Sequence, residues 1–284
     1  MGKRIKTPLR YPGGKSRALK TIDAYLPSSF TEYREPTIGG GSVFIHVKQK
    51  HPQAQFWIND LNPELFAFWQ ALQQDSEALI QGIWQVKRMR EDGKALYKDL
   101  ASWETEKSSI LARAIRFFLL NRITFSGTIE AGGFSQEAFN KRFTDSSIQR
   151  LESFGEFLKD VKITNRDYAE VVNAPGKDVF IFLDPPYLSV TKSRLYGKRG
   201  CLHTNFDHQR FAKTLRNCPH RWLITYDDCP EVRENFTDAY IYEWELQYGM
   251  NNYKQQKAQK GREVMIANYP IKANSQQKIQ LNLF

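Results

Sequence analysis

Two prolines that directly follow a run of five apolar residues constrain the fold of this chain more than any other feature. Val179–Leu183 reads Val-Phe-Ile-Phe-Leu, and Asp184, Pro185, Pro186 and Tyr187 come next. A continuous apolar run of this length predicts a strand buried on both faces, as in the parallel sheet of an α/β protein. The strand ends at the prolines, because proline cannot donate a ladder hydrogen bond. Ligands bind at the carboxyl ends of strands in open α/β sheets, so Asp184 and Tyr187 belong to a candidate site.

The groups in this turn suit the activation of an exocyclic amine on a nucleobase. Such an amine is a poor nucleophile, because its lone pair is delocalised into the ring. The Asp184 carboxylate and the Pro185 carbonyl could accept both N–H protons and favour the attacking form, while Tyr187 stacks on the base. A purely structural turn is the alternative, with Asp184 as a cap and Tyr187 as packing, since motifs of four residues also occur by chance. The turn resembles the Asp-Pro-Pro-Tyr motif of the amino-methyltransferases that modify adenine N6 or cytosine N4 in DNA.

A second motif lies near the N-terminus, where Tyr11 precedes Gly13, Gly14 and Lys15. A phosphate-binding P-loop is excluded, because the first glycine of that pattern would fall at Leu9. An aromatic ring, a glycine turn and a lysine can instead stack on a base and offer a cation to an anionic group. The segment resembles the N-terminal motif of Dam-type (D12 class) DNA adenine-N6 methyltransferases. The resemblance implies that Tyr11 and Lys15 contact S-adenosylmethionine.

A glycine-rich loop follows a short predicted strand, with Glu35 and Pro36 ahead of Gly39 and Gly41. Glycines at such positions let a backbone turn approach a ligand closely before a helix begins. The pattern resembles the E-P-F-x-G-x-G-S motif of the methyltransferases, with Thr37 in place of its bulky residue. The resemblance assigns Glu35, Pro36, Gly39 and Gly41 to the cofactor site.

Acidic residues follow two further predicted strands. Asp60 comes after a strand at 55–58, where it is placed to accept hydrogen bonds from a ribose diol. A helix N-cap is the alternative role, but Asn62 suits that role better because a proline follows it. Asp167 and Tyr168 come after a strand at 161–164, which should lie beside the strand of Asp60. Either side chain is expected near the adenine ring of the cofactor.

Between residues 64 and 160 the apolar residues recur at helical spacing, which predicts a mainly helical lobe inserted between the second and third strands. The lobe resembles the target-recognition lobe of the Dam-type family, where a helix end and a hairpin enter the major groove. An exposed hairpin is expected around Gly132 and Gly133. The resemblance implies DNA contacts by Asn121, Arg122, Lys141 and Arg142. For Arg122 a charge at a helix C-terminus is the alternative.

These elements predict an α/β fold, a Rossmann-like S-adenosylmethionine-dependent methyltransferase sheet with an inserted mainly helical target-recognition lobe. The catalytic domain is expected at 1–63 and 161–272, the lobe at 64–160, and a flexible C-terminal tail at 273–284. The order of glycine motif, lobe and catalytic motif resembles the Dam-type enzymes over residues 8–270. The resemblance implies a site-specific methyltransferase acting on N6 of an adenine flipped out of duplex DNA. A cytosine-N4 methyltransferase and a catalytically inactive DNA-binding relative are the alternatives.

Charge and cysteine content favour a nucleic-acid partner in a reducing compartment. The chain of 284 residues carries a formal net charge of +10, and 13% of its residues are aromatic; both properties favour a polyanion. Its three cysteines form no C-x-x-C pair, and no metal-ligand spacing occurs, so no metal is predicted. No signal peptide and no apolar run of about 18 residues is found. We therefore expect a cytoplasmic, nucleoid-associated protein of a bacterium or phage, without a membrane partner.

The last five residues form an apolar cluster on a polar stretch. The spacing of Gln280, Leu281, Leu283 and Phe284 resembles the Q-L-x-L-F peptide by which bacterial DNA-processing proteins bind the sliding clamp. Such a peptide loses conformational entropy as it becomes ordered in a hydrophobic groove. A short strand folded back on the protein is the alternative.

Overall fold

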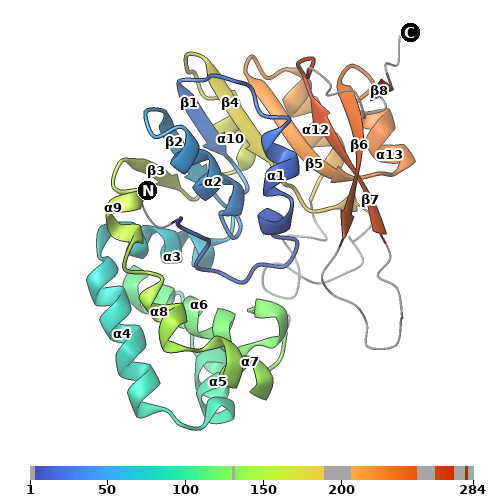
Figure 1. Ribbon diagram of the computed structural model, residues 1–284. Coiled ribbons are helices and arrows are strands. Elements are labelled where there is room, and N and C mark those ends of the chain that lie inside the picture. Colours follow the sequence, from blue (N-terminus) through green and yellow to red (C-terminus); the bar gives the residue numbers. More distant parts are fainter. Residues whose placement is uncertain (1–3, 130–131, 189–205, 248–259, 272–278, 281–284) are drawn as a thin grey trace.

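A mixed sheet forms the frame of the protein. The computed structural model describes residues 4–129, 132–188, 206–247, 260–271 and 279–280. The described strands lie in the order β3-β2-β1-β4-β5-β7-β6-β8 (Figure 1). The first five strands of the chain run parallel, whereas β7 pairs antiparallel with both β5 and β6. The bounds are β1 (Glu32–Glu35), β2 (Gln55–Asn59), β3 (Val161–Thr164), β4 (Val179–Leu183), β5 (Arg221–Asp227), β6 (Tyr240–Gln247), β7 (Lys260–Ala267) and β8 (Ile279–Gln280).

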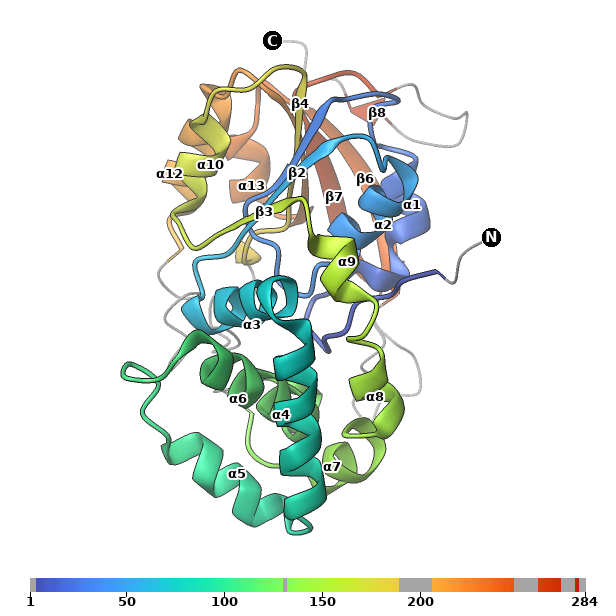
Figure 2. The ribbon, with the colours of Figure 1, turned by 90° about the vertical axis from the view of Figure 1, so that its left-hand side faces the viewer.

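The central position of β4 explains its unbroken apolar sequence. Its neighbours are β1 and β5, and all five of its residues are buried. Figure 2 shows α1 and α2 on one side of the sheet and α10, α12 and α13 on the other. Those helices are α1 (Leu19–Asp23), α2 (Ser42–Lys50), α10 (Tyr168–Asn173), α12 (His208–Arg216) and α13 (Pro230–Asn235), and a 3₁₀ turn, η1 (Lys15–Arg17), precedes α1. The predicted α/β methyltransferase fold is confirmed.

The chain between β2 and β3 is helical and lies below the sheet in Figures 1 and 2. Its α-helices are α3 (Pro63–Gln74), α4 (Ser76–Met89), α5 (Gly93–Ser102), α6 (Ile110–Ile123), α7 (Gln136–Arg142), α8 (Asp145–Gln149) and α9 (Phe154–Leu158). The ring of Phe68 on α3 stacks against Phe118 on α6, with centroids 6.1 Å apart. These two helices form the centre of the lobe.

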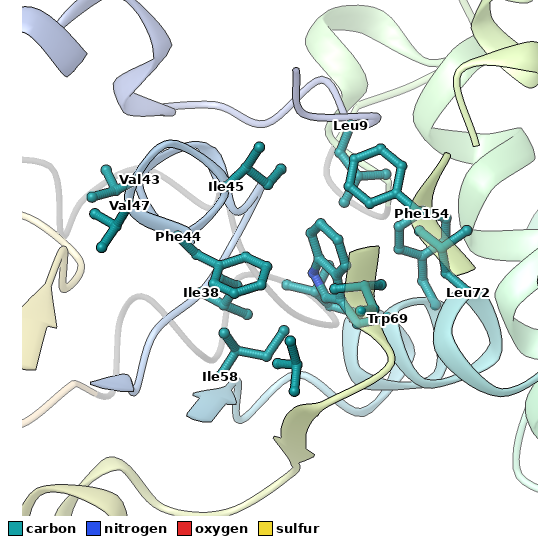
Figure 3. Close-up of a cluster of buried hydrophobic side chains, with 14 of the residues drawn as sticks. Leu9, Ile38, Val43, Phe44, Ile45, Val47, Ile58, Trp69, Leu72 and Phe154 are labelled. Atoms are coloured by element: carbon teal, nitrogen blue, oxygen red, sulfur yellow. The ribbon is translucent and has the colours of Figure 1, made fainter. Parts of the chain in front are cut away.

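The lobe and the sheet share one hydrophobic core. Trp69 of α3 is fully buried and belongs to the same cluster as Phe44 of α2 and Phe154 of α9. Figure 3 shows Trp69 between Phe154 of the lobe and Phe44 and Ile38 of the sheet domain. A continuous core of this kind fixes the position of the lobe relative to the strand ends.

The predicted hairpin around Gly132 and Gly133 is described only in part. Within the described part of this segment a single bridge pairs Thr124 with Phe134, and a 3₁₀ turn, η2 (Phe125–Gly127), follows Thr124. Within this turn Ser126 has a left-handed backbone, with a φ of 53°. Residues 130–131 of the predicted hairpin lie outside the described residues. The antiparallel bridge joins the two described ends of this segment.

The prediction of a flexible tail is wrong for two of its residues. Ile279 and Gln280 form β8, which pairs antiparallel with Tyr242 and Ile241 at the edge of the sheet. This is the alternative in which the chain folds back on its own sheet. Leu281, Leu283 and Phe284 lie outside the described residues.

Candidate active site

Three carboxylates meet at the carboxyl ends of neighbouring parallel strands. Glu35 ends β1, Asp60 follows β2 and Asp184 follows β4, and β1 lies between the other two strands. Glu35 is almost fully buried, and burial raises its pKa well above the usual value, with the charges of Asp184 and Asp60 acting in the same direction. The Tyr33 hydroxyl donates a hydrogen bond to Glu35. A concentration of buried negative charge at a strand mouth favours a cationic ligand.

Asp184 is held in place by groups from three other segments. The Nζ of buried Lys15 lies 2.8 Å from each of its carboxylate oxygens and also donates to the Gly13 carbonyl at 2.9 Å. The Thr225 hydroxyl on β5 donates to Asp184 Oδ1 at 2.8 Å. The backbone N–H of Asp184 donates to the Thr37 hydroxyl, 3.3 Å away. The carboxylate is thus fixed in one orientation before any ligand binds.

Tyr187 is positioned by three contacts and remains partly exposed. Its hydroxyl donates to Glu263 Oε2 at 2.9 Å, and its ring stacks on Tyr226 with centroids 6.0 Å apart. Lys15 Nζ lies 4.9 Å from the ring centroid. Pro185, between Asp184 and Pro186, is buried, which keeps the turn rigid. Sequence reasoning missed Glu263, although an acidic residue directly before the apolar run of β7 was a visible signal.

The glycine-rich loop is shaped by two aromatic residues. Gly39 and Gly41 have φ values of 48° and 68°, a left-handed conformation that glycine adopts without strain. A Cβ atom on Gly39 would lie 2.8 Å from the Tyr11 ring, and one on Gly41 would lie 2.8 Å from the Trp69 ring. Below the loop, the side-chain amide of Asn59 donates to the Pro36 carbonyl at 2.9 Å. The sequence thus brings Tyr11 onto the loop that leads into α2.

Asp60 supports the same loop from the end of β2. Its Oδ2 accepts the Gly39 N–H at 3.0 Å and its Oδ1 accepts the Asn62 N–H at 3.0 Å. Burial raises the pKa of Asp60 to about 6, against the lowering effect of these backbone hydrogen bonds. The predicted cap of α3 is confirmed, because the Asn62 side chain accepts hydrogen bonds from the N–H groups of Glu64 and Leu65.

Asp167 and Tyr168 have partners within the protein. Both oxygens of Asp167 accept hydrogen bonds from Arg210, at 2.8 and 2.9 Å, and these bonds lower its pKa. Asp167 also caps α10 by accepting the Ala169 N–H. The Tyr168 ring is buried against Phe211. These contacts fix both side chains after β3, and their approach to the adenine ring of the cofactor stays a prediction.

Two of the four predicted DNA contacts are buried, which corrects the prediction. Asn121 has no exposed surface, and its side-chain amide bonds the backbone N–H and carbonyl of Arg10 and the Gly127 carbonyl. Arg122 is only 4% exposed and lies over the Phe118 ring. Neither side chain can reach the edge of a base in this conformation. Both lie in the last turn of α6, where helix packing and the loop after it cover them.

Arg122 lies in a positive environment. Its Nε and Nη2 atoms have no hydrogen-bond partner within the described residues. Burial lowers its pKa to about 9, and the charges of Arg150, Arg10 and Arg142 add to this lowering. Arg142 is exposed, as is Lys141, which pairs with Glu137 at 3.0 Å on α7. Arg122, Arg142 and Arg150 of the lobe thus form an arginine cluster with Arg10 of the N-terminal segment, and the described residues provide none of the four with a carboxylate ion-pair partner.

Two other kinds of site are absent from the described residues. No helix there is long and apolar enough to cross a membrane. No group of three or more His, Cys, Asp or Glu side chains in that part of the chain could hold a metal ion.

Comparison with known proteins identifies the family. The sequence model of the D12 class N6 adenine-specific DNA methyltransferases matches residues 11–250.

Individual relatives are methyltransferases as well. The chain is 26% identical over 283 residues to the Type II methyltransferase M1.LlaDCHI of Lactococcus lactis subsp. cremoris, a match that covers 92% of this chain and 94% of the relative. It is 27% identical over 191 residues to a DNA adenine methylase of Vibrio cholerae, covering 65% of this chain and 66% of the relative. It is 28% identical over 240 residues to the DNA N-6-adenine-methyltransferase of Escherichia phage P1, covering 81% of this chain but 31% of that protein. With the Asp-Pro-Pro-Tyr turn lying at the mouth of a methyltransferase sheet, the chain belongs to the D12 class of N6 adenine-specific DNA methyltransferases.

Proposed function

We propose that this adenine-specific DNA methyltransferase performs its reaction at Asp184, Pro185, Pro186 and Tyr187, on an adenine that has left the duplex stack. The observation that carries the proposal is the Asp184 carboxylate at the end of β4, which accepts a hydrogen bond from the Thr225 hydroxyl on β5. From this position Asp184 and the Pro185 carbonyl accept the two N–H protons of the target amine, and Tyr187 stacks on the base. The lone pair on N6 is then free to attack. The proton that N6 releases after methyl transfer passes to solvent.

We propose S-adenosylmethionine as the methyl donor. When bound, it supplies a methyl group on a sulfonium sulfur, which leaves as a neutral thioether as the new C–N bond forms. The buried carboxylates fit this molecule, because its ammonium and sulfonium groups would favour an ionised Glu35, whose pKa is raised first by burial and then by the charges of Asp184 and Asp60. The residues proposed to hold it are Tyr11, Lys15, Glu35, Pro36, Gly39, Gly41, Asp60 and Asp184.

Lys15 lies where the proposal places the target base. Its ammonium contacts Asp184 and lies over the Tyr187 ring, which are the two groups proposed to bind the base. A methionine carboxylate would give Lys15 another partner. Binding of the cofactor is therefore proposed to draw Lys15 from the base pocket.

An exposed aromatic residue supports the proposal that the base is flipped out. The Phe125 side chain is 66% exposed on the loop after α6, directly beyond buried Thr124. The left-handed turn at Ser126 and the bridge at Thr124 fix this loop. A ring presented in this way can enter a base stack and compensate for the stacking lost by the flipped base. Lys141 and Arg142 on α7 are proposed to contact the DNA backbone nearby.

The end of the chain is proposed to bind a bacterial sliding clamp through Gln280, Leu281, Leu283 and Phe284. The support is the sequence pattern alone, and β8 must first leave β6, because Gln280 pairs with Ile241. Binding to its DNA substrate would place the protein at the nucleoid of a bacterium or of a phage-infected cell. The test compares clamp binding of the full chain with that of a chain ending at Ile279. Equal binding by the two would reject the role of these residues.

The reaction is tested by incubating the purified protein with S-adenosylmethionine and unmethylated genomic DNA, followed by sequencing with detection of modified bases. We expect N6-methyladenine within one short sequence. N4-methylcytosine, or the absence of any modified base while S-adenosylmethionine binds, would reject the proposal. Asp184→Ala serves as the matched variant, which should lose methylation and keep its affinity for DNA, because Asp184 contacts no phosphate in the proposed complex.

A further inference from the structure

A buried carboxylate in the antiparallel part of the sheet contacts the catalytic turn. Glu263 on β7 is 1% exposed, and its Oε2 accepts a hydrogen bond from the hydroxyl of Tyr187, 76 residues earlier in the chain, at 2.9 Å. A buried carboxyl group costs stability unless polar partners compensate for its lost hydration. The neighbouring residues of β7, Val264 and Met265, are apolar. We therefore expect an acidic side chain at this position to have a function that offsets its effect on stability.

The hydrogen bond to Glu263 gives Tyr187 its most specific constraint. Stacking on Tyr226 and the ammonium of Lys15 both act on the ring face, and both tolerate rotation or sliding of the ring. A hydrogen bond at the end of the ring is directional, so it fixes where the hydroxyl points. Since β7 pairs with both β5 and β6, its backbone holds the acceptor rigidly.

We infer that Glu263 is a positioning residue for methyl transfer, which acts through the Tyr187 hydroxyl to hold the ring in the orientation that stacks on the target base. The inference rests on the proposed function of Tyr187 and extends the site to a strand outside the recognised motifs. The inference assigns Glu263 no contact of its own with the base or the cofactor. Its effect on the reaction should disappear when the tyrosine hydroxyl is absent.

The charge state of Glu263 depends on groups from three segments packed around it. Lys15 from η1 favours the ionised carboxylate, whereas Asp184 after β4 and Asp227 on β5 oppose it, and Tyr187 donates its hydrogen bond. Burial has the largest effect, and together these influences raise the pKa to about 7. Above this pH the acceptor is a carboxylate, which binds a hydroxyl more strongly than a neutral carboxyl group does. The ring should therefore be held less firmly as the pH falls below about 7.

The test is a double-mutant cycle with Tyr187→Phe and Glu263→Gln, measured as single-turnover methylation of a duplex that the wild type modifies. At pH 8 we expect about tenfold slower transfer in Y187F and about fivefold slower transfer in E263Q, from loss or weakening of a charged hydrogen bond. The double variant should be no slower than about twofold below Y187F. Multiplication of the two effects, or a wild-type rate in E263Q, would overturn the inference. Glu243→Gln on β6, an exposed carboxylate paired with Arg233, is the matched control and should react at the wild-type rate.

A second measurement does not depend on activity. In protein labelled with ¹³C at the tyrosine Cζ, the Tyr187 resonance is identified by its absence in Y187F. We expect this resonance to titrate with a midpoint near pH 7 in the wild type, and to lose that titration in E263Q. A resonance that does not titrate would overturn the link between the two residues, even if the enzyme methylates adenine as proposed. If the link is seen but no methylation occurs, only the proposed function fails.

Discussion

The backbone N–H of Asp184 donates a hydrogen bond to the hydroxyl of Thr37, with 3.3 Å between the two atoms. This bond connects the glycine-rich loop after β1 with the catalytic turn after β4. Thr37 is also the residue at which the loop departs from the motif of its family. The departure therefore provides a polar link between the loop proposed to bind the cofactor and the carboxylate proposed to bind the base.

The first prediction tests this link with Thr37→Val, which keeps the shape of the side chain but removes the acceptor. The Asp184 N–H would lose a bond worth about 0.5–1.5 kcal/mol, so we expect methyl transfer to slow by roughly twofold to tenfold. The measurement is the single-turnover rate at saturating S-adenosylmethionine. Thr37→Ser keeps the hydroxyl and serves as the control. Equal rates for the valine variant and the wild type would show that the link does not matter.

The parts of the fold and site that the sequence predicted are those carried by local patterns. The apolar run of Val179–Leu183 marks a fully buried strand, and Asn62 before Pro63 marks a helix cap, because each depends on neighbouring residues alone. Burial of Asn121 and Arg122 could not be predicted in the same way. Asn121 is covered because it bonds the backbone of Arg10, 111 residues away, and no local pattern reports such a contact. The same holds for Glu263, whose partner lies on another strand end.

The second prediction concerns Arg122→Met, which retains an apolar side chain on the Phe118 ring and removes a buried charge whose Nε and Nη2 atoms have no hydrogen-bond partner among the described residues. The free energy of unfolding should stay within about 1 kcal/mol of the wild type or increase, because desolvation of the charge is no longer required. Affinity for DNA should fall equally on all sequences, since only the field of the arginine cluster weakens. Urea unfolding and anisotropy titrations with two unrelated duplexes measure the two effects.

For comparison, Arg142→Met removes an exposed charge of the same cluster. It should also weaken binding to both duplexes. The slope of log affinity against log salt concentration should fall by the amount expected for about one lost phosphate contact. Loss of affinity on the methylated sequence only, in the Arg122 variant, would instead mean that this arginine rearranges to read a base.

The third prediction is that Phe125→Ala impairs base flipping and leaves the fold intact. The side chain is largely exposed, so unfolding should change by no more than about 0.5 kcal/mol. Loss of a ring that fills the base stack should weaken the flipped complex by about 1–3 kcal/mol. A duplex with 2-aminopurine at the target adenine measures this as a smaller rise in fluorescence upon binding. Met89→Ala on α4, which removes another exposed apolar side chain, is the control and should give the full rise.

The fourth prediction concerns stability, because the position of Glu263 should cost the protein free energy at high pH. Its pKa is raised from 4.5 to about 7 in the folded state, so between these values the folded protein binds more protons than the unfolded chain. Stability from this group is therefore greatest below about pH 4.5 and is lost as the pH rises toward 7, by roughly 3 kcal/mol in total.

The variant Glu263→Gln cannot be deprotonated at this position. It should be more stable than the wild type at pH 8, and this advantage should shrink as the pH is lowered to 5.5. Urea unfolding of both proteins at the two pH values measures the difference, with Glu243→Gln as the exposed control. An advantage that is the same at both pH values would show that Glu263 does not titrate in this range. If Glu263→Gln is more stable than the wild type only at pH 8 and transfers the methyl group more slowly, the buried Glu263 charge lowers the stability of the enzyme and also holds the Tyr187 ring in position.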